Sequence, residues 1–74
     1  MIKYSFTTVI NQEGKYYISN CLELNVVSQG ESIEEAMSNL REAVELYLED
    51  IPKEELREYL HNKPMVSTLD FEYA

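Results

Sequence analysis

Residues 32–48 read SIEEAMSNLREAVELYL, and this stretch decides the fold. Ser32, followed three residues later by Glu35, is the pattern of a capping box, in which each side chain satisfies a backbone N–H at the start of a helix. Apolar residues then recur at spacings of three and four, which predicts a long amphipathic helix that packs on a sheet. The apolar set is Ile33, Ala36, Met37, Leu40, Ala43, Val44, Tyr47 and Leu48.

Three strands are expected before this helix. Apolar and polar residues alternate from Ile2 to Ile10, which is typical of a strand with one buried face. Turn formers that end in Gly14 connect this strand to a Tyr-rich run, so that the two form a hairpin. A short apolar stretch that ends in turn formers predicts the third strand. The expected strands are residues 2–10, 15–21 and 24–27, with turns at 11–14 and 28–30.

Two further elements are expected after the helix. Pro52 suits the start of a second, short helix over residues 53–60. Residues 65–73 alternate again, with Leu69, Phe71 and Tyr73 on one side, which predicts a C-terminal strand. The sequence thus predicts a single α+β domain over residues 1–74, in which the long helix covers one face of an antiparallel sheet.

Charge and composition narrow the classes of function. The chain has 74 residues, 14 acidic against 6 basic side chains, and a formal net charge of −8. This balance argues against direct nucleic-acid binding, which needs clustered Lys and Arg, and favours a basic protein as partner. Cys21 is a lone cysteine, which fits a reducing compartment. The N-terminus resembles neither a signal peptide nor a membrane span, so we expect a cytoplasmic protein.

The residue types give little support for catalysis, and we expect no catalytic, cofactor or metal site. Cys21 follows strand residues and is expected to be a small buried group, whereas His61 falls in a polar connector. One Cys and one His do not meet the three or four ligands that zinc requires. The alternative is a minimal metal-dependent nuclease, in which Asp70 or Glu72 joins Glu23 in holding Mg²⁺.

Three segments carry a resemblance to a known family: YISNCLEL at 17–24, VSQGESIEEA at 27–36 and NLREA at 39–43. In their order and spacing they resemble the HicB-like antitoxins, although Leu22 stands where that family often has Pro. The resemblance implies a partial ribonuclease-H-like fold without ribonuclease activity. It also implies a short, stand-alone member, without a C-terminal DNA-binding domain, that binds and neutralises a small basic mRNA-cleaving toxin of the HicA type and forms dimers or higher homo-oligomers.

Two surfaces are candidates for these contacts. Acidic residues Glu13, Glu23, Glu31 and Glu34 are expected to meet a basic partner. The C-terminal strand is expected to lie at a sheet edge, where Val66, Thr68, Asp70 and Glu72 would pair with another chain. The other hypothesis is an orphan structural domain that associates only with copies of itself.

Overall fold

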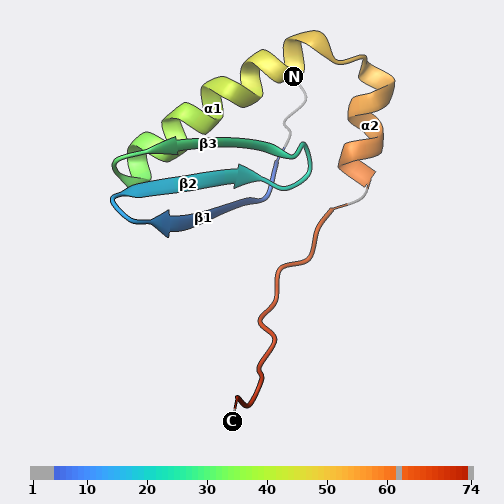
Figure 1. Ribbon diagram of the computed structural model, residues 1–74. Coiled ribbons are helices and arrows are strands. Elements are labelled where there is room, and N and C mark those ends of the chain that lie inside the picture. The colour runs from blue at the N-terminus through green and yellow to red at the C-terminus, as the bar shows by residue number, and fades with distance from the viewer. Residues whose placement is uncertain (1–4, 62, 74) are drawn as a thin grey trace.

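The computed structural model describes residues 5–61 and 63–73 and has the α+β architecture expected (Figure 1). Its strands form one antiparallel sheet in the order β1-β2-β3, so β2 is central and both β1 and β3 are edges. Helix α1 lies over β3 and β2 on one face of the sheet, and α2 follows beyond its end. The elements are β1 (Thr8–Glu13), β2 (Tyr16–Cys21), β3 (Val26–Gly30), α1 (Ile33–Asp50) and α2 (Lys53–His61).

The hairpin turn is tighter than predicted. Strand β1 begins at Thr8 and continues to Glu13, which pairs with Tyr16, so the expected turn at residues 11–14 is wrong. The chain reverses over Gly14 and Lys15, where Gly14 has a φ of +60° that a residue with a side chain rarely adopts. The first residues of the predicted strand, 2–4, lie outside the described part of the chain.

Strand β3 begins later than predicted. Residues 22–25 form a turn in which Asn25 takes a left-handed φ of 57°, and Leu24 is buried within that turn rather than in a strand. The residues expected to end the strand are paired instead, with Ser28 opposite Ser19 and Gly30 opposite Tyr17. The third strand is therefore confirmed, but its predicted bounds of 24–27 are wrong.

The core is thin, as the short chain implies. Among the described residues, four apolar side chains are buried where α1 meets the sheet and the adjoining turn, and the largest of them are Leu40, at 2% exposed, and Leu24, at 4%. The predicted apolar face of α1 is confirmed over most of its length, whereas Ile33 is 49% exposed. The buried set is Cys21, Leu24, Ala36 and Leu40, flanked by the partly buried Phe6, Val26, Val44, Tyr47, Leu48 and Tyr59.

The start of α1 is capped much as predicted. The backbone N–H of Glu35 donates to Ser32 Oγ at 3.0 Å. The return bond differs, because Glu35 Oε1 accepts from the N–H of Glu31 at 3.3 Å rather than from that of Ser32. The cap therefore fixes both ends of the short connection between β3 and the helix.

Helix α2 is held near the body by its tyrosine. The hydroxyls of Tyr59 and Tyr47 are 3.3 Å apart and share a hydrogen bond. This bond, with some desolvation, raises the pKa of Tyr59 to about 12. The second helix is confirmed and runs one residue further than predicted, to His61. Within the described residues, neither helix is long and apolar enough to cross a membrane.

The predicted C-terminal strand is not formed. Residues 63–73 have no helix or strand and run away from the body of the domain (Figure 1). A strand requires a neighbour that satisfies its backbone N–H and C=O groups, and the chain alone places none beside this segment. We call residues 65–73 the C-terminal tail.

Replacing Ser32 with Ala should lower the free energy of unfolding by about 1 kcal/mol, because the Glu35 N–H loses its acceptor. Urea denaturation followed by circular dichroism measures the loss. Ser38→Ala is the matched control, because Ser38 is an exposed residue inside the same helix, where Ala should leave stability unchanged or slightly higher. Equal losses in the two variants would contradict the capping role.

Candidate protein-binding surfaces

Three of the four predicted acidic residues lie at one end of the domain. Glu13 ends β1 opposite the start of β2, where Tyr17 also pairs with Gly30 at the end of β3. Glu31 directly follows Gly30, and Glu34 lies in the first turn of α1. All three side chains are exposed. We call Glu13, Glu31 and Glu34 the acidic end.

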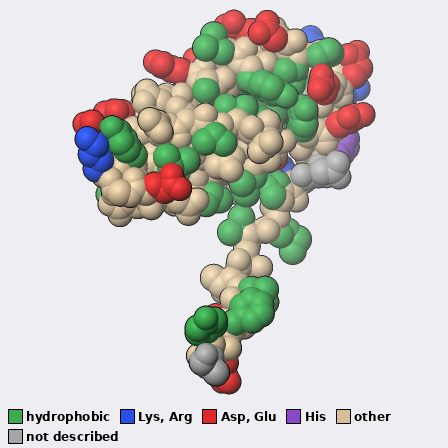
Figure 2. All heavy atoms as spheres, in the orientation of Figure 1, with side chains coloured by type: hydrophobic (Ala, Val, Ile, Leu, Met, Phe, Trp, Pro, Cys, Tyr) green, Lys and Arg blue, Asp and Glu red, His purple; other side chains and the backbone are tan. Residues whose placement is uncertain are grey.

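Further carboxylates cover the outer faces of both helices, as Figure 2 shows. Fewer cations lie on the helices, namely Arg41, Lys53 and Arg57, and Arg41 pairs with Glu45 at 3.6 Å. The helical surface therefore presents negative charge to solvent over a wide area. Its exposed carboxylates include Glu34, Glu35, Glu42, Glu45, Glu49, Asp50, Glu54 and Glu55.

Glu23 does not belong to this surface, and its prediction as a partner-binding residue is corrected. It is 8% exposed, in the turn before β3, and both carboxylate oxygens are occupied. Oε1 accepts from the N–H of Thr7 at 2.7 Å, and Oε2 accepts from its hydroxyl at 2.9 Å. The carbonyl of Thr7 also accepts from the N–H of Leu22 at 2.9 Å. Glu23 thus fastens the residues before β1 to the turn after β2.

The residues of the nuclease alternative are not brought together. Glu23 is buried against Thr7, whereas Asp70 and Glu72 are exposed in the C-terminal tail. Among the residues that the structure describes, no three His, Cys, Asp or Glu side chains converge as a metal-ion site. His61 ends α2 and is exposed, rather than lying in the connector where it was expected.

The edge-strand residues Val66, Thr68, Asp70 and Glu72 are all exposed in the tail. They pair with no strand, although the tail keeps an extended form (Figure 1). The sheet itself has edges at β1 and β3. Pairing of the tail with another chain stays a prediction.

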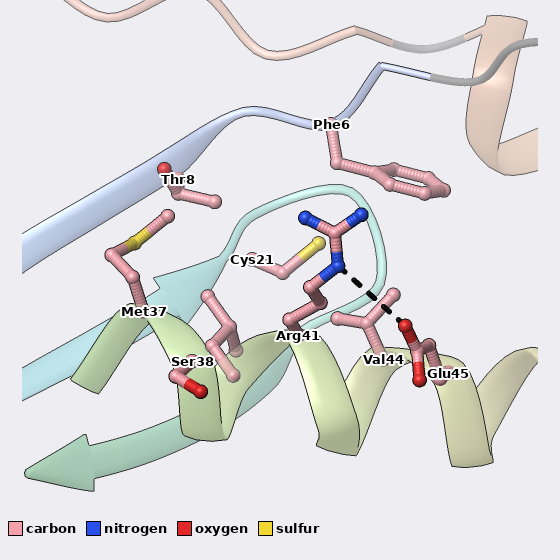
Figure 3. Close-up of a pocket in the computed structure, with 9 residues that line it drawn as sticks. Phe6, Thr8, Cys21, Met37, Ser38, Arg41, Val44 and Glu45 are labelled. Carbon is pink, nitrogen blue, oxygen red and sulfur yellow. Dashed lines mark ion pairs between the residues drawn. The ribbon is translucent and has the colours of Figure 1, made fainter. Parts of the chain in front are cut away.

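A groove lies between α1 and the start of β1, and the sequence patterns did not predict it (Figure 3). It arises because α1 packs over β3 and β2, so the inner side of β1 has no helix above it. Its volume is about 580 Å³. Apolar side chains dominate its lining, which consists of Phe6, Thr8, Cys21, Met37, Ser38, Leu40, Arg41, Val44 and Glu45. We call this feature the β1 groove.

The apolar pattern of α1 contained part of the signal for the groove. Met37 and Val44 belong to the predicted apolar stripe but are only half-buried, and both face the β1 groove. Which part of a broad stripe meets a sheet depends on where the helix crosses it, and local periodicity does not determine that.

Cys21 reaches the floor of the groove from β2. Its side chain is fully buried, and desolvation raises the pKa of the thiol above its ordinary value. Backbone hydrogen bonds from Leu24 and Glu23 oppose this shift, while the negative charge of Glu23 adds to it. The prediction of a small buried group is confirmed, and the thiol is a poor nucleophile here.

Two curated relatives are similar to this chain. A UPF0150 protein of Synechocystis is 40% identical over 62 residues, which cover 81% of this chain and 90% of that protein. A UPF0150 protein of Helicobacter pylori is 40% identical over 48 residues, or 65% of this chain and 67% of that protein. No family model matches the chain. No solved structure matches it either.

Glu23→Ala should reduce the free energy of unfolding by about 1–3 kcal/mol, because the part-buried N–H of Thr7 loses its charged acceptor. Chemical denaturation measures this change. Glu13→Ala, at an exposed position, should change stability by less than about 0.5 kcal/mol. If the two variants unfold at the same denaturant concentration, Glu23 does not have the structural role assigned to it.

Alkylation of Cys21 by iodoacetamide at mildly alkaline pH should be far slower in the folded protein than in urea. The raised thiol pKa lowers the thiolate fraction, and burial blocks access to the sulfur. Mass spectrometry of the modified chain over time gives both rates. Similar rates in the two conditions would mean that the sulfur is accessible in the native state.

Proposed function

The chain belongs to the UPF0150 family, and we propose that it is a protein-binding module that binds and neutralises a small basic toxin of the HicA type. We propose that this interaction takes place in the cytoplasm. The acidic end forms the surface that meets the toxin, and the carboxylates of the two helices add to the long-range attraction. The chain contributes contact and charge to this interaction, and no catalytic group.

The observation that carries the proposal is the exposed negative surface. Glu13, Glu31 and Glu34 are exposed at one end of the domain, and among residues 5–61 and 63–73 none of the three forms an ion pair, whereas Glu45 pairs with Arg41. With a net charge of −8, the domain attracts a basic protein from a distance. Such complementarity speeds encounter and selects the partner more than it deepens affinity.

The resemblance to HicB-like antitoxins supports the same proposal, although its residues act mainly in the fold. Ser32 and Glu35 cap the start of α1. Gly30 allows the end of β3 to approach the helix, since a Cβ there would lie 2.5 Å from the backbone nitrogen of Ala36. The shared segment VSQGESIEEA is therefore a strand-to-helix connection that places Glu31 and Glu34 at the surface.

The test uses a HicA-type toxin encoded beside this chain's gene, with its catalytic His replaced so that it can be purified. The wild-type chain should bind it, and binding should weaken as salt is raised. The variant Glu13→Gln/Glu31→Gln/Glu34→Gln should bind about tenfold more weakly, since three exposed charges together contribute roughly 1–2 kcal/mol. Calorimetric titration at two salt concentrations measures both effects.

A matched control removes the same charge elsewhere. Glu42→Gln/Glu49→Gln/Glu54→Gln changes three exposed carboxylates on the helices and should weaken binding by less than the acidic-end variant. Equal weakening would move the contact surface away from the acidic end. No binding by the wild-type chain, together with failure to relieve toxin-induced growth arrest on co-expression, would overturn the proposed function.

A further inference from the structure

The C-terminal tail is an apolar segment left in solvent. Leu69 is 79% exposed, Phe71 is 82% exposed and Tyr73 is fully exposed. Figure 2 shows hydrophobic side chains along the tail. In the described part of the chain, the tail takes part in no hydrogen bond or ion pair. Removing this much apolar surface from water lowers the free energy, so we expect the tail to bind to a complementary apolar site.

The edge of β1 and the β1 groove together provide such a place. Strand β1 pairs with β2 on one side, and its other side offers unpaired backbone N–H and C=O groups. The groove adjoins the start of this edge, since Thr8 is the β1 residue that lines it, and there Phe6, Met37 and Val44 present apolar surface. A strand added at this edge would satisfy the backbone groups and would place alternate side chains in the groove.

The tail matches this place in length and in pattern. Its nine residues, in extended form, span about 30 Å, against about 20 Å for the six residues of β1. Leu69, Phe71 and Tyr73 alternate with Asp70 and Glu72, so one face of an added strand would be apolar and the other charged. The apolar face would meet the groove, and the charged face would remain in water.

The connection to the tail indicates which copy of the chain accepts it. Pro64 fixes its own φ and biases Lys63 towards an extended conformation, which favours an extended start of the segment that leads into the tail. The tail points away from the sheet of its own copy (Figure 1). A second copy can receive it without a reversal of the chain, and the same exchange then occurs in the other direction.

We propose that residues 65–73 of each copy add a strand to the β1 edge of a second copy and place Leu69, Phe71 and Tyr73 in its β1 groove, giving a dimer with exchanged tails. This dimer is independent of any toxin. Glu31 and Glu34 follow β3, at the edge of the sheet opposite β1, so the dimer leaves them exposed and does not rest on the proposed function.

The first experiment measures the mass of the purified full chain by light scattering and its dimer dissociation constant by sedimentation. The wild-type chain should be a dimer. Leu69→Ser/Phe71→Ser should raise the dissociation constant at least about a hundredfold, since two large apolar side chains are lost from each of two grooves. Thr68→Ser/Glu72→Gln, on the other face of the tail, should remain dimeric with an unchanged constant.

The second experiment shows whether the tail occupies the β1 groove of its own copy or that of the other copy. Cys21 is replaced by Ala in two variants, one carrying Met37→Cys in the groove and the other Phe71→Cys in the tail. A short bis-maleimide cross-linker should join the two variants into a heterodimer after mixing. A third variant carrying both cysteines should give cross-linked dimers rather than an internally bridged monomer.

Three results would overturn the proposal. They are a monomeric wild-type chain, a dimer that survives Leu69→Ser/Phe71→Ser unchanged, and internal bridging of the double-cysteine monomer. Circular dichroism of each variant guards against misfolding as the cause; the tail residues lie outside the core of the domain, whereas Cys21 belongs to it.

Discussion

The structure depends on the close contact between the start of α1 and the sheet. Ser19 and Ala36 are fully buried against each other, and the hydroxyl of Ser19 donates to the carbonyl of Ala36 at 2.8 Å. Gly30 completes the contact, because any side chain there would collide with the backbone at Ala36. Small residues on both sides therefore let the helix lie directly on β2 and β3, which a larger side chain would prevent.

This placement of the helix determines what the domain offers to other molecules. Since α1 is held over β2 and β3, the inner side of β1 stays uncovered and the β1 groove results. The bonds between Glu23 and Thr7 hold the approach to β1, and with it Phe6 at the groove. The outward faces of both helices carry charged side chains, most of them carboxylates. The domain therefore has an apolar groove beside β1 and acidic faces on its helices.

Local sequence patterns predicted the helices and most of the strands. The positions of the turns and the burial of individual side chains depended on contacts between residues far apart in the sequence. The capped helix from Ser32 and the short helix after Pro52 followed from periodicity and capping. The turns were misplaced because the left-handed positions are Gly14 and Asn25, and turn-forming residues at 11–13 and 28–30 paired as strand instead. The burial of Glu23 could not be foreseen, because it depends on Thr7, sixteen residues away.

Hydrogen–deuterium exchange of the full chain at rising protein concentration tests most directly whether its free edge and apolar tail are completed by another copy. Amides of β2, paired on both sides, should exchange slowly at every concentration. Amides of residues 65–73 and the outward N–H groups of β1 should exchange quickly in dilute solution and become protected together as the concentration rises. Rapid exchange of the tail at all concentrations, with unchanged exchange along β1, would contradict the account.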